Sequence, residues 1–248
     1  MKYLVLIVLS VFFLNCKQEK TEELSAQSII DSSIEVSGGK QIAASEIGFT
    51  FRDIHYKAKR LNGTYALIRK QNKGKDWIID SLTNTDFKRS VNNTSVEVPD
   101  SMVTRYSASV NSVHYFSVLP YGLNDQAVNK KRLEDSSIKG KNYYAIQVTF
   151  DPNGGGEDFE DVFIYWINKA TEKVDYLAYS YNEDDGKGLR FREAYNERYL
   201  NGIRFVDYNN YKPEDATVSL AILPQLFEGG KLQLLSKIEL ENLSVSLH

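Results

Sequence analysis

Two acidic stretches contain residues of the type and spacing that bind a hard metal ion. Residues 151–161 and 182–186 are rich in Asp and Glu and contain no Lys or Arg. Calcium takes about six to eight oxygen ligands, which flexible acidic loops can supply. The stretches follow the first and third strands of one predicted antiparallel meander, so they meet at the same end of the sheet. The candidate metal ligands are Asp151, Glu157, Asp158, Asp161, Asp184 and Asp185.

An alternative for the same residues is that they form two solvated hairpin tips without a metal. The first stretch is not an EF-hand, because the twelfth residue from Asp151 is Val162 and not Glu. Calcium is therefore left open, and no other cofactor is expected.

A second set of residues, within 143–195, suits an apolar or amphipathic ligand. Concave sites with aromatic walls and few polar groups bind such ligands. Arg190 and Arg192 share one strand face, where they could hold a carboxylate or a lipid head group. The alternatives are core packing for the aromatic residues and a solvated face for the arginines. The candidate ligand-binding residues are Ile164, Trp166, Tyr176, Tyr179, Arg190, Phe191 and Arg192.

The chain contains no recognisable catalytic motif. No G-x-S-x-G, H-E-x-x-H, P-loop or G-x-G-x-x-G pattern occurs. The three histidines, His55, His114 and His248, are far apart in sequence, and a partly buried structural imidazole is the simplest interpretation of His114. The sequence therefore predicts a protein that is not an enzyme, with a hydrolase lacking a known motif as a minor alternative.

The only cysteine, Cys16, ends an apolar segment. After a basic start, residues 3–14 are apolar except for Ser10. This run is shorter than the roughly 20 residues that span a bilayer, and it has the build of a secretory signal. Because it ends directly at Cys16, it resembles the lipobox of bacterial lipoproteins, in which the cysteine is lipidated. We expect a signal peptide over 1–15 and a lipidated tether over 16–23; a plain signal or an uncut anchor is the alternative.

The remaining residues, 24–248, are expected to form a single domain, because no repeat, linker or break in composition divides them. The formal net charge is −3 and the sequence pI is about 5.7. A nucleic-acid groove needs a basic excess, so no nucleic-acid partner is expected.

The predicted elements are mostly strands. Helical periodicity occurs over 24–37, which Gly38 and Gly39 end, and after Pro99 up to about residue 118. Strands are expected at 47–52, 65–71 and 75–82, and a strand or a pair of strands is expected at 87–98. A four-stranded meander is expected over 143–195, with further strands at 203–209 and 232–243. The segment 213–227 is expected to be a loop or short helix.

The strand at 161–168 is apolar on both faces, so both faces must be covered. The pattern favours a mainly β fold, a curved antiparallel sheet or incomplete β-barrel of about ten strands covered by two or three helices.

Several stretches together resemble a family of uncharacterised predicted lipoproteins from Gram-negative bacteria. They are NSVHYFSVLPYGLND (111–125), DVFIYW (161–166), DYLAYSY (175–181), RFREAYN (190–196) and NGIRFVDYNNY (201–211). The resemblance implies a fold similar to the LolA/LolB lipoprotein carriers, with an apolar cavity, and it assigns no catalytic or binding residue.

The expected function is a non-catalytic envelope lipoprotein, anchored to a membrane and binding or carrying a lipid or acyl chain. The outer membrane is the expected location, with the periplasmic or surface face left open, and a monomer is expected. The alternative is an envelope protein without a ligand that acts through its surface, with calcium at the acidic loops.

Overall fold

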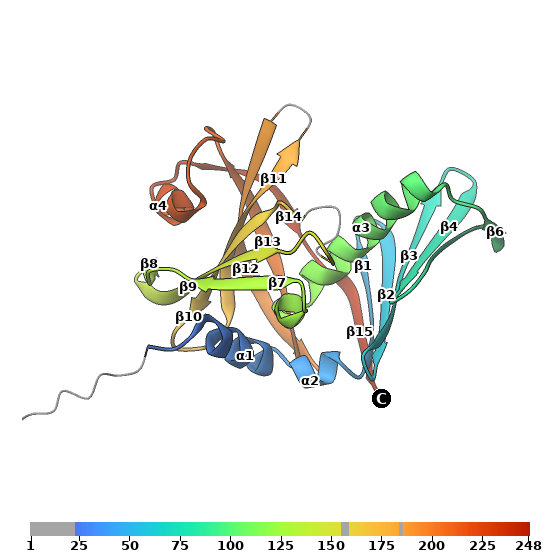
Figure 1. The fold of residues 1–248 in the computed structure, drawn as a ribbon, viewed down its shortest axis with the longest axis horizontal. Coiled ribbons are helices and arrows are strands. Elements are labelled where there is room, and N and C mark those ends of the chain that lie inside the picture. The colour runs from blue at the N-terminus through green and yellow to red at the C-terminus, as the bar shows by residue number, and fades with distance from the viewer. Residues whose placement is uncertain (1–22, 155–158, 184–185) are drawn as a thin grey trace, which may run out of the picture.

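Two antiparallel sheets and a few helices make up the fold (Figure 1). The computed structural model describes residues 23–154, 159–183 and 186–248. Neither sheet closes into a barrel, which confirms the mainly β, incompletely closed fold class. The described residues form fifteen strands, whereas about ten were expected. Residues 1–22, including Cys16, lie outside the described residues, so the division into signal, tether and domain stays a prediction.

Sheet 1 has seven strands in the order β15-β1-β2-β3-β4-β5-β6. Their bounds are β1 Ser45–Phe51, β2 Ile54–Leu61, β3 Thr64–Lys73, β4 Asp76–Thr83, β5 Phe87–Val91, β6 Thr94–Val96 and β15 Glu241–Leu247. The segment 87–98, expected to be a strand or a pair, is the pair β5 and β6, and β2 is an additional strand. In β2, Lys57 and Lys59 alternate with the buried residues Tyr56 and Ala58, as expected of a sheet with one solvated face.

Sheet 2 has eight strands, with β8 paired to β9 beside the path β14-β13-β12-β11-β10-β9-β7. Their bounds are β7 Val128–Arg132, β8 Ser136–Ile138, β9 Lys141–Phe150, β10 Val162–Asn168, β11 Val174–Glu183, β12 Gly186–Leu200, β13 Ile203–Pro213 and β14 Leu232–Ile238. The strands β9 to β12 form the meander predicted over 143–195.

The helices are α1 Ala26–Val36, α2 Gly39–Ile42, α3 Asp100–Ser117 and α4 Leu223–Glu228, with 3₁₀ turns η1 Tyr121–Asn124 and η2 Leu220–Ile222. The Ser25 side chain caps α1 by accepting a hydrogen bond from the backbone N–H of Ser28 at 3.0 Å. Gly38, with φ of 86°, turns the chain after α1, as the two glycines predict. The segment 213–227, which was expected to be a loop or short helix, contains η2 and most of α4.

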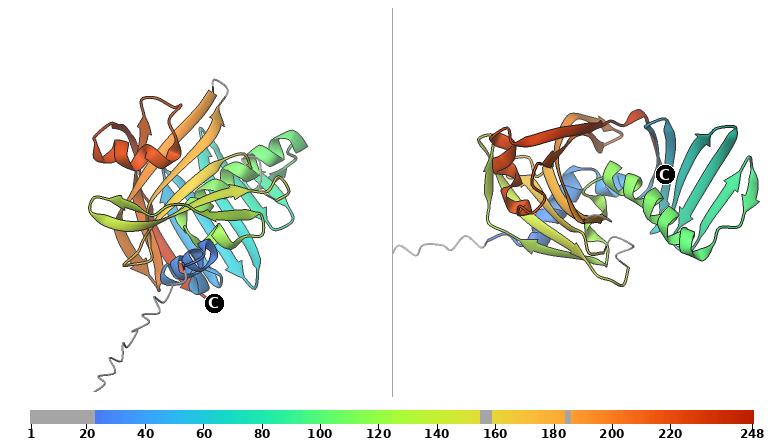
Figure 2. Two further views of the ribbon diagram at one scale, coloured as in Figure 1. Left: turned by 60° about the vertical axis from the view of Figure 1, so that its left-hand side comes forward. Right: turned by 90° about the horizontal axis from the view of Figure 1, so that it is seen from above.

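The predicted strand over 232–243 is two strands in different sheets, which is a correction to the sequence-based expectation. β14 pairs with β13 in sheet 2, and β15 pairs with β1 in sheet 1. Between them the backbone N–H of Leu240 donates a hydrogen bond to Asp207 Oδ1 at 3.0 Å. The chain therefore crosses from one sheet to the other at this point, as the red ribbon in the right view of Figure 2 shows.

Helix α3 lies between the two sheets and contacts both (Figures 1 and 2). On one side, Val110 packs against Ala58 and Leu67 of sheet 1. Near its C-terminal end, Tyr115 and Phe116 pack against the core of sheet 2. The helix thus bridges the two sheets. Elsewhere the sheets are joined by the chain between β14 and β15, and Ile42 of α2 packs against residues of both.

Candidate functional site

The two faces of sheet 2 are covered by different elements. We call the face that contacts α1 and α3 the inner face and the face that contacts α4 the outer face. In β10, Phe163, Tyr165 and Ile167 belong to the inner core, together with Ile29 and Ile30 of α1. Ile164 and Trp166 belong to the outer core. Both faces of this strand are therefore buried, which is why its sequence is apolar throughout.

Four of the candidate ligand-binding residues lie in the outer core. Ile164, Trp166, Tyr176 and Phe191 pack with Leu223 at the start of α4. Their aromatic rings are in direct contact, with the ring centroids of Tyr176 and Phe191 5.7 Å apart and those of Trp166 and Phe191 5.8 Å apart. These four side chains do not line the groove described next.

The groove lies on the inner face of sheet 2, below the C-terminal half of α3, and has a volume of about 570 Å³. This volume is within the range of about 300–1,000 Å³ that is usual for small-molecule sites. Its apolar walls include Val113 and Phe116 of α3 and Phe163 of β10. Ile238 at the end of β14 and Leu240, where the chain crosses between the sheets, also line it. The other three candidate ligand-binding residues, Tyr179, Arg190 and Arg192, all line it.

Arg192 is the most buried charge in the groove wall, with 8% of its surface exposed. Its Nη2 donates a hydrogen bond to the Tyr179 hydroxyl at 2.7 Å. The guanidinium lies 4.1 Å from the ring centroid of Phe116 and 5.0 Å from that of Tyr179. Its Nε is buried and has no hydrogen-bond partner. A buried donor without an acceptor is uncommon, because it loses its hydration without compensation.

Asn210 pairs with Arg192 across β12 and β13 and also lines the groove. Its Nδ2 donates a hydrogen bond to Ser236 Oγ at 3.2 Å, whereas its buried Oδ1 has no partner. The groove wall therefore holds a donor and an acceptor that the described protein atoms leave unsatisfied, close to each other on adjacent strands.

Arg190 is on the same strand face as Arg192, as their spacing predicts. Its guanidinium lies 4.9 Å from the ring centroid of Tyr181, and its Nη1 donates to the Leu189 carbonyl at 2.9 Å. Arg190 is partly exposed, so it is nearer to solvent than Arg192.

The two acidic stretches meet at one end of sheet 2. Val162 pairs with Ser180, and Asn182 Nδ2 donates a hydrogen bond to Glu160 Oε2 at 2.8 Å. Asp161 lines the groove at this end. Within the part of the chain that the structure describes, no group of three or more His, Cys, Asp or Glu is placed to hold a metal.

Of the candidate metal ligands, only Asp151 and Asp161 are described. Asp151 Oδ1 accepts a hydrogen bond from Asn129 Nδ2 at 3.2 Å. The other four, Glu157, Asp158, Asp184 and Asp185, lie outside the described residues. The calcium site therefore stays a prediction.

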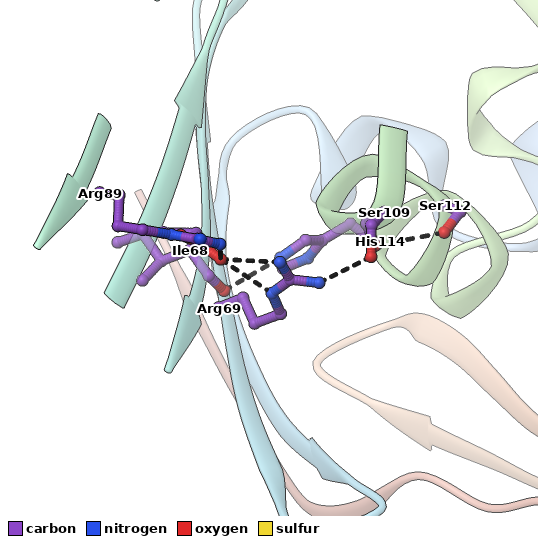
Figure 3. Close-up of polar contacts among 7 residues, drawn as sticks. Ile68, Arg69, Arg89, Ser109, Ser112 and His114 are labelled. Atoms are coloured by element: carbon purple, nitrogen blue, oxygen red, sulfur yellow. Dashed lines mark hydrogen bonds and ion pairs between the residues drawn. The ribbon is translucent and has the colours of Figure 1, made fainter. Parts of the chain in front are cut away.

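The opposite side of α3 carries a polar network that the sequence did not predict (Figure 3). The buried Asp80 of β4 accepts hydrogen bonds from Arg69 Nη2 at 2.7 Å and from Arg89 Nε at 2.6 Å. Arg69 Nη1 also donates to Ser109 Oγ of α3 at 2.7 Å. Because its partners are on different strands and a distant helix, no local pattern in the sequence indicates this network.

His114 is fully buried between α3 and sheet 1 and does not line the groove. Its Nε2 lies 3.1 Å from the Ile68 carbonyl, and its Nδ1 has no partner. Burial, with smaller contributions from the charges of Arg60 and Arg69, lowers the pKa of His114 to about 3. His114 is therefore a neutral structural residue, more buried than expected, and a weak base at neutral pH.

No helix in the described ranges is both long enough and apolar enough to span a bilayer.

One protein-family model matches the chain over residues 2–240, and its description is a family of unknown function, DUF6503. This match confirms the resemblance to an uncharacterised family. No curated protein matches the chain.

Several solved structures are similar in fold. A LolA superfamily protein from Nitrosomonas europaea has 13% identity and a TM-score of 0.48, covering 90% of this chain and 92% of its own. A putative outer membrane lipoprotein-sorting protein domain from Vibrio parahaemolyticus has 9% identity and a TM-score of 0.45, covering 90% and 94%. A DUF1329 family protein from Desulfovibrio piger has 12% identity and a TM-score of 0.46, covering 88% and 92%.

Proposed function

Because the chain belongs to the family of unknown function DUF6503, we propose its function from the groove: the protein binds an apolar or amphipathic ligand, such as a lipid or an acyl chain, without converting it chemically. The observation that carries this proposal is the cavity of about 570 Å³ between α3 and the inner face of sheet 2. Its walls combine aromatic and aliphatic side chains with a few polar groups, the usual composition of a small-molecule site.

The geometry offers little for catalysis. His114, the histidine of α3, is buried against sheet 1 and away from the groove, and it has a pKa of about 3. Within the described residues, the polar groups that line the groove are those of arginine, tyrosine, asparagine, serine and one aspartate, and no histidine or cysteine is among them. These groups are suited to holding a ligand rather than to transferring its protons.

We also propose that the protein acts at the envelope, held to a membrane by lipid on Cys16. The support is the apolar segment that ends at this cysteine. A single acyl chain gives only weak anchoring, so a stable attachment needs more than one chain on the cysteine. Metabolic labelling with a radioactive fatty acid tests this: label is expected on the wild-type chain and none on Cys16→Ser. Equal labelling of both would overturn the anchor.

Native mass spectrometry of the full chain, released from detergent micelles, tests the groove. A co-purifying amphiphile at one-to-one stoichiometry is expected. Ser112→Trp places a large side chain into the groove from α3, because Ser112 lines it, and is expected to reduce occupancy strongly. Thr104→Trp is the matched control, because Thr104 is exposed on the same helix and does not line the groove. An unliganded wild-type mass that does not change after incubation with envelope lipids would overturn the proposal.

The edge strand β14 of sheet 2 favours a second candidate function. In this function the protein binds no ligand and acts through its surface. Leu234 and Leu235 of the edge strand β14 are 47% and 40% exposed. An edge strand with exposed apolar residues can pair with another chain. A protein partner captured by the wild type but not by Leu235→Lys would favour this function over ligand binding.

A further inference from the structure

Three arginines are buried in the described structure, and only one of them has no carboxylate partner among the described residues. Arg69 is 7% exposed and pairs with Asp80 at 2.7 Å, and Arg204 is 4% exposed and pairs with Glu197 at 2.6 Å. Arg192 is 8% exposed, and its nearest polar partner is the Tyr179 hydroxyl. The difference is that Arg192 faces the groove, whereas the other two do not.

A buried guanidinium needs compensation for the hydration that it loses. The hydroxyl of Tyr179 and the ring of Phe116 supply part of it, the latter through a cation–π contact of 4.1 Å. Neither group carries a negative charge, and Nε still has no acceptor. Arg192 therefore lines the groove while one of its guanidinium donors, Nε, has no acceptor.

We propose, on the basis of the proposed function, that the groove selects amphiphiles with a carboxylate head group and that Arg192 binds this carboxylate. Arginine and carboxylate form paired, charge-assisted hydrogen bonds, which are stronger than neutral ones. The apolar chain of the ligand would lie against Phe116, Phe163 and Ile238, which line the same groove.

The neighbouring groups favour one negative charge rather than two. Arg192 offers the one buried positive charge among the described residues that line the groove, because Arg190 and Arg52 in the same wall are nearer to solvent. Asp161 adds a negative charge to this wall. A doubly charged phosphate monoester would leave an uncompensated negative charge next to apolar walls, whereas a carboxylate is balanced by one guanidinium. The free Oδ1 of Asn210 can accept a hydrogen bond from a hydroxyl or amide next to the carboxylate.

Isothermal titration calorimetry on the full chain tests the inference with three probes that share a twelve-carbon chain: dodecanoate, 1-dodecanol and dodecyl phosphate. Wild-type protein is expected to bind dodecanoate about 10- to 100-fold more tightly than 1-dodecanol, as the strength of hydrogen bonds to charged groups implies. Arg192→Met removes the charge but keeps an apolar side chain of similar length. It is expected to abolish this preference and leave binding of 1-dodecanol nearly unchanged.

Arg192→Lys keeps the charge but not the fork, so an intermediate preference is expected. Lys187→Met is the matched control, because it removes one positive charge from an exposed position on the same strand, outside the groove. It is expected to leave both affinities unchanged. Thermal unfolding of each variant identifies any that do not fold. The comparison of probes on the wild type tests head-group selection without any variant.

The outcomes separate the two proposals. Equal binding of dodecanoate and 1-dodecanol by the wild type would overturn head-group selection while leaving the apolar groove in place. An equal loss of both probes in Arg192→Met would assign Arg192 a structural role only and also overturn it. Tighter binding of dodecyl phosphate than of dodecanoate would replace the carboxylate with a phosphate. No binding of any probe would overturn the proposed function together with this inference.

Discussion

At the scale of residues, the structure satisfies the buried charge of Asp80 from neighbouring strands. Asp80 is fully buried and receives hydrogen bonds from two arginines, Arg69 and Arg89. Arg89 in turn lies 3.6 Å from the ring centroid of Tyr106 in α3. The network therefore ties α3 to sheet 1, and it contains two arginines for one carboxyl group.

Replacing Asp80 by Ala is expected to lower the free energy of unfolding by about 3–5 kcal/mol, because the buried guanidinium of Arg69 and the partly buried one of Arg89 lose their carboxylate. Urea unfolding followed by circular dichroism measures this change. Asp86→Ala is the control: its pair with Lys88 is 51% and 78% exposed, so a loss below about 1 kcal/mol is expected. Similar losses for both variants would contradict a structural role for the buried network.

His114 predicts a dependence of stability on pH. Its pKa is about 3 in the folded protein, whereas an unfolded chain has a histidine pKa near 6.5. The unfolded state therefore takes up a proton that the folded state does not, as pH falls between these two values. The contribution of His114 to stability is therefore fully present above about pH 6.5. It is lost as the pH falls below this value, by up to about 1.4 kcal/mol per pH unit.

Urea unfolding of the wild type and of His114→Gln, between pH 7 and pH 4.5, measures this contribution. The variant is expected to be less stable at pH 7 but to lose less stability on acidification, because the carboxylates common to both proteins cancel in the comparison. The same pH slope for both proteins would contradict the lowered pKa.

At the scale of elements, the corner between α1 and α2 fits closely against the β12–β13 turn. Gly38 has a φ of 86°, and a Cβ at this position would lie 2.3 Å from the Gly202 carbonyl oxygen. The backbone N–H of Arg204 also donates to the Ser37 carbonyl at 3.1 Å. This contact holds α1 over the inner core of sheet 2, where Ile29 and Ile30 are buried.

Gly38→Ala is expected to be destabilising for two reasons, the positive φ and the overlap with Gly202. Gly63→Ala is the matched control, because Gly63 has a φ of 75° but no atom within 4 Å of an added Cβ. The first variant is expected to cost about 1–3 kcal/mol more than the second, which is the usual cost of overpacking. Equal midpoints in a urea titration of the two variants would show that the corner can relax.

At the scale of the whole molecule, the groove exists because α3 separates two sheets that do not close into one barrel (Figure 2). The open sheets also leave free edges. The edge strand β7 contains Lys130, Lys131 and Arg132, and such charges oppose pairing with another chain. The edge strand β14 instead exposes Leu234 and Leu235.

The full chain is expected to be monomeric at micromolar concentration, because the charged edge at β7 does not favour pairing and the exposed edge at β14 is only seven residues long. Sedimentation velocity in a detergent that masks any lipid anchor measures this. A dimer in the wild type that Leu235→Lys converts to a monomer would contradict the expectation and would favour the surface-interaction alternative.

The amino-acid sequence alone determined the features that depend on periodicity. Alternation predicted the meander and the burial of both faces of β10, and a spacing of two residues predicted that Arg190 and Arg192 share a face. Strand reversals predicted that the acidic stretches meet at one end of the sheet, which the contact between Glu160 and Asn182 shows. These features follow from local backbone geometry, so they can be read from neighbouring residues.

Only the tertiary structure decided which face of sheet 2 is hollow. Alternation separates Trp166 and Tyr176 from Tyr179 and Arg192, but it gives no indication of which set is packed under α4 and which faces the groove beside α3. The split of 232–247 between two sheets and the Asp80 network were also decided there. The reason is physical: covering elements and ion-pair partners come from segments far away in the chain, and their positions depend on packing of the whole molecule.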